Sequence, residues 1–241
     1  RYRRRAPRRF IHCDREINIA MCGRYNLIED ARALVDFFNL DNSLEMLPRY
    51  NIAPSQDIPV VRQDGEGREL SLLRWGLIPH WAKDHKIGYR MINARAETVA
   101  EKPSFRTAFR RRRCLIPATG FYEWKKVAGG KQPYNIRMKD GGLFAFAGLW
   151  ERWKGGDGNL VESCTIIVTD ANDLVRPVHE RMPVILDPAD YGTWLDPGLQ
   201  EPARLQPLLV PHPSAGMDLY PVSSRVGSPA NDDPQLLQHA R

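Results

Sequence analysis

The sequence predicts a single α+β domain built on a strongly curved, barrel-like antiparallel β-sheet with peripheral helices. Three observations lead to this fold class. Strand-like segments outnumber helical ones, glycine-rich turns separate them, and the strand–helix alternation of a parallel sheet is missing. The chain has 241 residues, of which 42% are hydrophobic and 27% charged, so it can bury one large core.

Three helices are expected around the sheet, each marked by a start signal. They cover residues 31–40, 105–112 and 187–195. The first has apolar residues at helical spacing after a capping box of Asn26 and Glu29. Ser104 is expected to cap the second helix, and the third opens with an Asp-Pro pair.

The expected strands are apolar or alternating runs between turn-rich segments. They cover residues 58–62, 69–75, 120–126, 133–138, 143–151 and 163–169. The first two flank the turn sequence QDGEG and predict a hairpin. Residues 196–241 are rich in proline and serine, so we expect an irregular wrap that ends in a loose tail over 233–241.

Positive charge is concentrated at the start of the chain. The whole chain carries +6 and residues 1–20 carry +5, so residues 21–241 carry only +1. The arginine-rich start has no helical or strand period. It is a nucleic-acid arm, a targeting segment, or sequence upstream of a true start at Met21. We favour the last interpretation, in which residues 1–20 are a disordered extension outside the mature protein and the domain spans 21–232.

Composition also bears on location and cofactors. No apolar run approaches the roughly 20 residues that cross a membrane, and the start lacks a signal-peptide core. The cysteines show no disulfide spacing, which favours a reducing, cytoplasmic location. The Cys, His and Glu positions fit no common zinc pattern, so we expect neither a metal nor another cofactor.

Four polar residues stand where a core pattern would not require them: Cys22, Asn93, Glu123 and His179. Glu123 lies between two aromatic residues in a strand-like run, where desolvation would raise its pKa and suit it to proton transfer. His179 lies in a loop bounded by two prolines. Each position also has a plain structural interpretation: a buried thiol, an asparagine in a turn, a solvent-facing carboxylate and a structural histidine.

The ordered set of motifs in this chain resembles the SRAP family, the SOS response-associated peptidases. The matching segments run from Met21 to about residue 232 in the family's order. They are MCGRYN, RYNIAPSQ, RWGLIPHWAKD, MINARAET, FRRRRCLIPATGFYEWKK, AFAGLWE, TIIVTDAND, VHERMPVIL and YPVSSRV. The resemblance implies the SRAP fold.

The resemblance also implies a function. The family recognises abasic sites in single-stranded DNA and crosslinks itself to them through a cysteine that directly follows the initiator methionine, a match that falls on Cys22. Its functional Asn, Glu and His fall on Asn93, Glu123 and His179. The amine and thiol of an N-terminal cysteine would close a thiazolidine ring on the aldehyde of the lesion. Glu123 would move protons, His179 would help open the sugar ring, and Asn93 would orient the aldehyde.

Two other functions stay open on the sequence alone. The family name and a blocked Cys22 nitrogen allow a cysteine-dependent autopeptidase. A noncatalytic reader of modified bases would use the same cleft. For the first function, lyase-like DNA–protein crosslinking, we expect a monomer that acts on abasic single-stranded DNA in the cytoplasm and associates with the nucleoid.

Arginines and aromatic residues supply an expected DNA-binding surface. Its members are Arg24, Arg74, Trp75, Trp81, Arg95, Arg106, Arg110, Arg111, Arg112 and Arg113. The arginines would contact phosphates, and the tryptophans, together with Tyr122, would stack on bases. The alternatives are that the arginine run is a solvated helix end and that the aromatic residues belong to the core.

Overall fold

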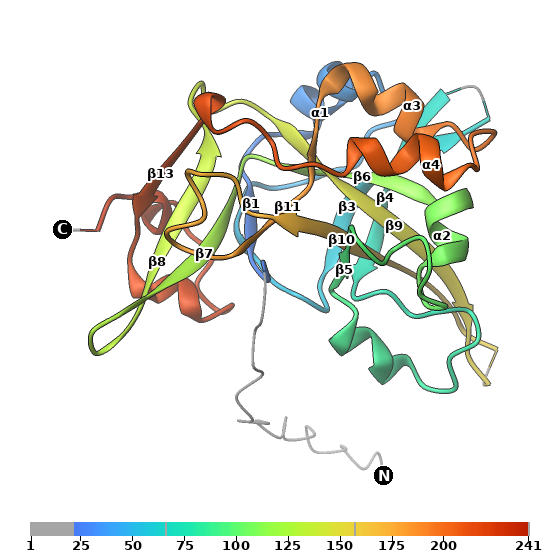
Figure 1. Ribbon diagram of the computed structural model, residues 1–241, viewed down its shortest axis with the longest axis horizontal. Coiled ribbons are helices and arrows are strands. Elements are labelled where there is room, and N and C mark those ends of the chain that lie inside the picture. Colours follow the sequence, from blue (N-terminus) through green and yellow to red (C-terminus); the bar gives the residue numbers. More distant parts are fainter. Residues whose placement is uncertain (1–21, 66, 157, 241) are drawn as a thin grey trace, which may run out of the picture.

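The computed structural model describes residues 22–240 apart from Glu66 and Asp157 (Figure 1). The expected arginine-rich extension therefore lies outside the described residues. Within the described part of the chain, no helix is long and apolar enough to cross a membrane.

The larger sheet closes on itself through five strands. They are β3 (Asp57–Asp64), β4 (Gly67–Trp75), β10 (Leu160–Asp170), β9 (Phe144–Lys154) and β6 (Arg113–Ala118). Each strand pairs with the next in this order, and β6 pairs back to β3. The barrel-like sheet is thus confirmed. Its one departure from the antiparallel expectation within this ring is the short parallel pairing of β4 with β10.

Three short strands pair with strands of this ring and extend the sheet. Strand β5 (Asn93–Arg95) runs parallel to β10, and β11 (Arg181–Pro183) runs antiparallel to it. Strand β12 (Ile185–Leu186) pairs with β9. Because β5 and β11 both pair with β10 at Val168, they bring two distant chain segments to the same end of that strand.

A second sheet of five antiparallel strands packs against the ring (Figure 1). Its order is β13 (Met217–Pro221), β8 (Gly130–Met138), β7 (Gly120–Val127), β1 (Tyr25–Leu27) and β2 (Arg49–Ile52). The two sheets meet through aromatic edges: the rings of Tyr25 and Phe121 each make an edge-on contact with Phe146 of β9. These contacts lie in one shared apolar core.

The helices are short and lie at the periphery. They are α1 (Ala31–Phe38), α2 (Arg106–Arg111), α3 (Tyr191–Leu195) and α4 (Pro202–Leu205). Short 3₁₀ helices cover His85–Arg90, Pro188–Asp190, Gln206–Leu208, Ser214–Gly216, Ser224–Gly227 and Pro234–Leu237.

Two expected caps are wrong. The side chain of Asp30 caps α1 by accepting from the amide of Ala33, whereas Asn26 lies buried in β1. No side chain caps α2, since Phe105 rather than Ser104 precedes its first residue.

The C-terminal region is better ordered than the expected wrap and tail. Leu236 is fully buried, and the ring of His239 stacks on Tyr220 with centroids 4.1 Å apart. Val222 forms a β-bridge with His239. The loose tail is therefore a wrong expectation for residues 233–240, because proline-rich composition does not reveal a buried leucine anchor.

Candidate active site

The pairing of β1 with β7 brings the start of the domain to Glu123. Tyr25 lies opposite Phe121, and the amide of Tyr122 donates to the carbonyl of Arg24 at 3.0 Å. This register carries the residues before β1 alongside the middle of β7. Cys22 therefore reaches a carboxyl group that lies 101 residues further along the chain.

Cys22 and Glu123 form a buried pair. The backbone nitrogen of Cys22 donates to Oε1 of Glu123 at 2.8 Å, and the two residues are 2% and 3% exposed. Burial raises the pKa of the Glu123 carboxyl to about 8, although the hydrogen bonds from Cys22 act in the opposite direction. Burial and the nearby carboxyl raise the pKa of the Cys22 thiol well above its ordinary value. At neutral pH the pair thus holds a largely protonated carboxyl beside a neutral thiol.

Asn93 joins this pair from the barrel. It begins β5, and its Nδ2 donates to the carbonyl of Cys22 at 3.3 Å. Ahead of it, the loop that follows β4 is closed by a backbone contact. A Cβ added at Gly76 or at Gly88 would lie 2.6 Å from the carbonyl oxygen of the other glycine. The amide of Leu77 also donates to the Met91 carbonyl at 3.0 Å, so the position of β5 is fixed independently of the loop.

His179 lies at the same end of β10 without a hydrogen bond to this cluster among the described residues. Its Nδ1 accepts from the amide of Arg181 at 3.1 Å. The guanidinium of Arg181 in turn pairs with Glu97, two residues after β5, and with Asp170. Three of the four sequence-predicted residues are therefore hydrogen-bonded together, and the fourth is held on a neighbouring loop. The solvent-facing alternative for Glu123 is wrong.

Comparisons with known proteins decide the family. Residues 21–229 match the family model described as SOS response associated peptidase (SRAP). The chain belongs to the SRAP family. It is 49% identical over 222 residues to abasic site processing protein YoqW of Bacillus subtilis, covering 90% of this chain and 99% of that protein. It is 30% identical over 268 residues to abasic site processing protein HMCES of Mus musculus, covering 95% of this chain and 74% of that protein.

A solved structure supports the SRAP fold. A crystal structure of a protein from Bacteroides thetaiotaomicron superposes with a TM-score of 0.83 at 30% identity, covering 91% of this chain and all of that one. The fold class expected from the sequence is thereby confirmed.

The expected DNA-binding residues of this SRAP domain divide by exposure. Trp81, Arg95, Arg106, Arg110 and Arg111 are exposed. Two others are half-buried and already engaged. The guanidinium of Arg74 lies 5.8 Å from the ring centre of Tyr89, and Arg112 pairs with the buried Glu151 at 2.7 Å.

Four expected DNA contacts are wrong, because their side chains are buried in structural roles. Trp75 is a core residue whose Nε1 donates to the carbonyl of Ile92 at 2.9 Å. Arg113 donates to five backbone carbonyls, which belong to α2, to α3 and to the segment after α3. Tyr122 is buried with its hydroxyl on the carbonyl of Tyr50, and Arg24 is 5% exposed. The sequence pattern marks the charge or ring of each side chain but not which way it points.

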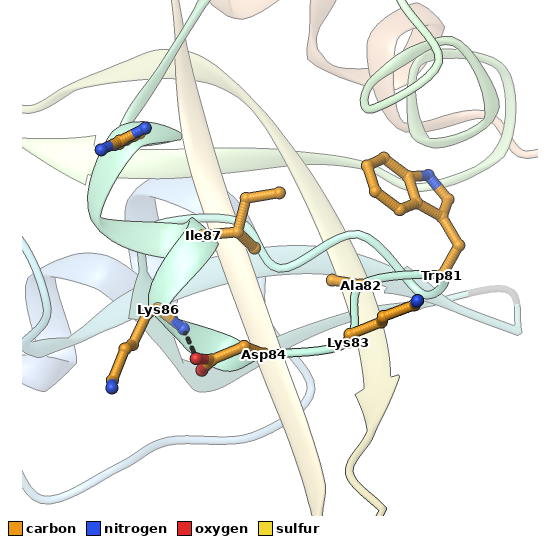
Figure 2. Close-up of a pocket in the computed structure, with 7 residues that line it drawn as sticks. Trp81, Ala82, Lys83, Asp84, Lys86 and Ile87 are labelled. Atoms are coloured by element: carbon orange, nitrogen blue, oxygen red, sulfur yellow. Dashed lines mark hydrogen bonds between the residues drawn. The ribbon is translucent and has the colours of Figure 1, made fainter.

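A basic hollow lies in the loop between β4 and β5, and sequence reasoning named only one of its residues. Its volume is about 560 Å³, and it is lined by Trp81, Ala82, Lys83, Asp84, Lys86, Ile87 and Arg90. Figure 2 shows that the Asp84 carboxylate accepts from the backbone of Lys86. The basic character of this loop could have been predicted from the sequence WAKDHKIGYR, which contains three Lys or Arg residues and one Asp. Among the described residues, no group of three His, Cys, Asp or Glu side chains is placed to hold a metal ion.

Proposed function

We propose that this chain captures abasic sites in single-stranded DNA as a covalent thiazolidine crosslink through Cys22, once Cys22 is the first residue. The observation that carries the proposal is the 2.8 Å hydrogen bond between the Cys22 nitrogen and the Glu123 carboxyl. That nitrogen is the atom that would attack the aldehyde of an opened abasic sugar. The names of the relatives, abasic site processing proteins, support the same substrate.

The reaction balances with one water released. The free α-amine of Cys22 adds to the aldehyde carbon and gives a carbinolamine. The protonated Glu123 carboxyl donates a proton to the departing hydroxyl, which leaves as water, and the resulting carboxylate takes the proton from the nitrogen, so that a neutral imine forms. The thiol then adds to the imine carbon while its proton passes to nitrogen, with Glu123 as the relay. No oxidant or reductant is needed, and the closed ring prevents strand cleavage by β-elimination.

The other two residues receive supporting roles. Asn93 holds the Cys22 carbonyl at 3.3 Å, so it limits rotation about the bond that orients the amine. His179 would transfer a proton to the ring oxygen of the closed sugar, which exposes the aldehyde. The exposed arginines and the basic hollow would bind the phosphates on either side of the lesion. The monomeric state and the cytoplasmic, nucleoid-associated location stay predictions.

Three forms of the protein beginning at residue 22 test the aminothiol chemistry. Cys22→Ser and Cys22→Ala keep the amine, so we expect heat-labile adducts that borohydride traps. Acetylation of the amine, with the thiol intact, should abolish both the stable and the trappable product. Denaturing gels with an abasic oligonucleotide give the readout. A stable adduct from the acetylated protein would show that sulfur acts alone.

The same geometry favours a second activity when a residue precedes Cys22. The thiol would attack the preceding carbonyl and form a thioester, and the Cys22 nitrogen would leave as an amine after protonation by Glu123. Water would then hydrolyse the thioester and regenerate the thiol. Intact mass over time should show loss of the preceding segment in the wild type and its retention in Glu123→Gln. If neither trimming nor crosslinking occurs and abasic DNA binds reversibly, the protein is a noncatalytic reader.

A further inference from the structure

Arg24 is a buried cation without a carboxylate partner among the described residues. It lies two residues after Cys22 and is only 5% exposed. Burial lowers the pKa of its guanidinium. Burying a charged side chain without an opposite charge costs free energy of folding, so we expect the buried Arg24 guanidinium to have a specific role.

The guanidinium of Arg24 joins two separate segments to the start of the domain, immediately before β1. Its Nη1 donates to Oδ1 of Asn51 at 3.0 Å and to the carbonyl of Val226 at 2.7 Å, and its Nη2 donates to the carbonyl of Gly227 at 2.9 Å. Asn51 belongs to β2, whereas the two carbonyls belong to the C-terminal segment 223–233, which we term the strap. Arg24 thus fastens the strap over the start of the domain.

Asn51 completes the same connection. It is fully buried, and its Nδ2 donates to the strap carbonyls of Val226, Ser228 and Asn231 at 3.2, 2.9 and 2.7 Å. The strap also contacts the backbone of Asn51, because the carboxylate of Asp232 accepts from the backbone amide of Asn51 at 3.0 Å. Arg24, Asn51 and the strap therefore form one continuous hydrogen-bond network, centred on the two buried side chains.

This network leads directly to the reacting pair. The carbonyl of Arg24 accepts from the amide of Tyr122, the residue before Glu123, at 3.0 Å. The hydroxyl of Tyr122 donates to the carbonyl of Tyr50, the residue before Asn51. The segment that begins with Cys22 and the strand that carries Glu123 are therefore both tied to β2 next to the strap network.

We infer that Arg24 is a positioning residue: through Asn51 and the strap it holds the Cys22 nitrogen against the Glu123 carboxyl. The inference rests on the proposed function. It makes the C-terminal strap, remote in sequence, a part of the active site. It also replaces the phosphate contact that the sequence predicted for Arg24, since the guanidinium points into the strap and away from solvent.

Separate measurements of binding and capture test the inference. Arg24→Lys keeps the charge but cannot reach all three acceptors, and Asn51→Ser removes the amide that donates to the strap. The matched control is Arg225→Ala, which removes the exposed pair with Asp233 and leaves the Arg24 contacts in place. Affinity is measured with an oligonucleotide carrying tetrahydrofuran, an abasic analogue without an aldehyde. Capture is measured as the crosslinking rate at saturating abasic DNA.

We expect the two variants to lower the rate of crosslinking without lowering the affinity for DNA. Both variants should crosslink about 10–100-fold more slowly at saturation, because a small misplacement of reacting atoms has an effect of this size. Affinity for the tetrahydrofuran oligonucleotide should match that of Arg225→Ala. The fall of the rate at alkaline pH should move to higher pH, because the Cys22 hydrogen bond holds down the pKa of Glu123. Loss of the hydrogen bond from the Cys22 thiol would act in the same direction, and Lys131, the charged group that also acts on Glu123, is unchanged in both variants.

Two outcomes would overturn the inference. Weaker tetrahydrofuran binding with a reduced salt slope and an unchanged saturating rate would make Arg24 a DNA contact. A lower melting temperature with unchanged capture and an unchanged pH profile would make it a purely structural residue.

A further readout is independent of DNA. Alkylation of the Cys22 thiol, followed by peptide mass, should be faster in Arg24→Lys and Asn51→Ser than in Arg225→Ala, while Cys114 stays protected. Equal alkylation rates at Cys22 would also contradict the inference. If the wild type formed no crosslink, the proposed function would fail while this measurement still tested the positioning.

Discussion

At the scale of single residues, Glu123 is a carboxyl group whose surroundings favour the protonated form. It is 3% exposed and accepts from the Cys22 nitrogen. Glu123→Gln keeps the shape and the acceptor but cannot transfer a proton. We expect unchanged affinity for single-stranded DNA and capture slowed by about 10²–10⁴-fold. Binding and single-turnover crosslinking measure the two effects, and equal reductions in both would mark Glu123 as a DNA-positioning residue.

The raised pKa of Glu123 also predicts how capture depends on pH. The α-amine reacts only when unprotonated, and its ordinary pKa is about 7.7–8.0. Glu123 donates only when protonated, and its pKa is about 8 while the Cys22 nitrogen is an uncharged amide. The rate should therefore pass through a maximum between the titrations of the amine and the carboxyl and fall on both sides. In Glu123→Gln the fall at alkaline pH should vanish and the fall at acidic pH should remain; an alkaline fall that persists in this variant would assign it to another group.

At the scale of elements, α2 presents two exposed arginines in its last turn, Arg110 and Arg111. Replacing both by alanine should weaken binding to all single strands alike. The salt slope should flatten by about 0.7 for each phosphate that the variant no longer neutralises. Arg32→Ala with Arg204→Ala removes the same charge from exposed positions on α1 and α4 and should leave the slope unchanged. If the two double variants behave identically, α2 is a solvated helix end.

The elements also show how far the sequence alone could lead. Alternation and turn residues predicted the hairpin of β3 and β4 and the strands β7, β8, β9 and β10 to within a few residues, but not β6. The short strands β1, β5 and β11 have too few residues for a visible period, and their partners lie far along the chain. The polar residues Cys22, Asn93 and Glu123 were predictable because they break an apolar pattern. The burial of Arg24 and Arg113 was not, since it depends on backbone carbonyls that tertiary folding supplies.

At the scale of the whole molecule, Glu123 links stability to pH. Its pKa is higher in the folded protein than the ordinary 4.5, so the folded state binds more protons between about pH 4.5 and 8. The contribution of Glu123 to the free energy of unfolding is therefore fully present below pH 4.5 and is lost as the pH rises through 8. Urea unfolding at pH 5 and pH 9 should show this decrease in the wild type and a smaller one in Glu123→Gln. Equal decreases would place the titrating group elsewhere.

The end of the chain should contribute to stability as a core element does. Leu236→Ala removes a fully buried side chain and should lower the free energy of unfolding by about 2–5 kcal/mol. Leu47→Ala, at a position 79% exposed, should change it by less than about 0.5 kcal/mol. Urea unfolding of the two variants gives the comparison, and similar values would mean that the C-terminal anchor opens freely.

The contact between Gly76 and Gly88 has a consequence for how this fold can vary. The backbones of these two glycines are so close that neither position has room for a side chain. The loop between them therefore begins and ends at the same place in the fold. Residues 79–86 could therefore be lengthened or exchanged as a cassette without moving Asn93. An engineered chain could receive a new loop there, with a different preference for the DNA beside the lesion, while the crosslinking chemistry stayed as it is.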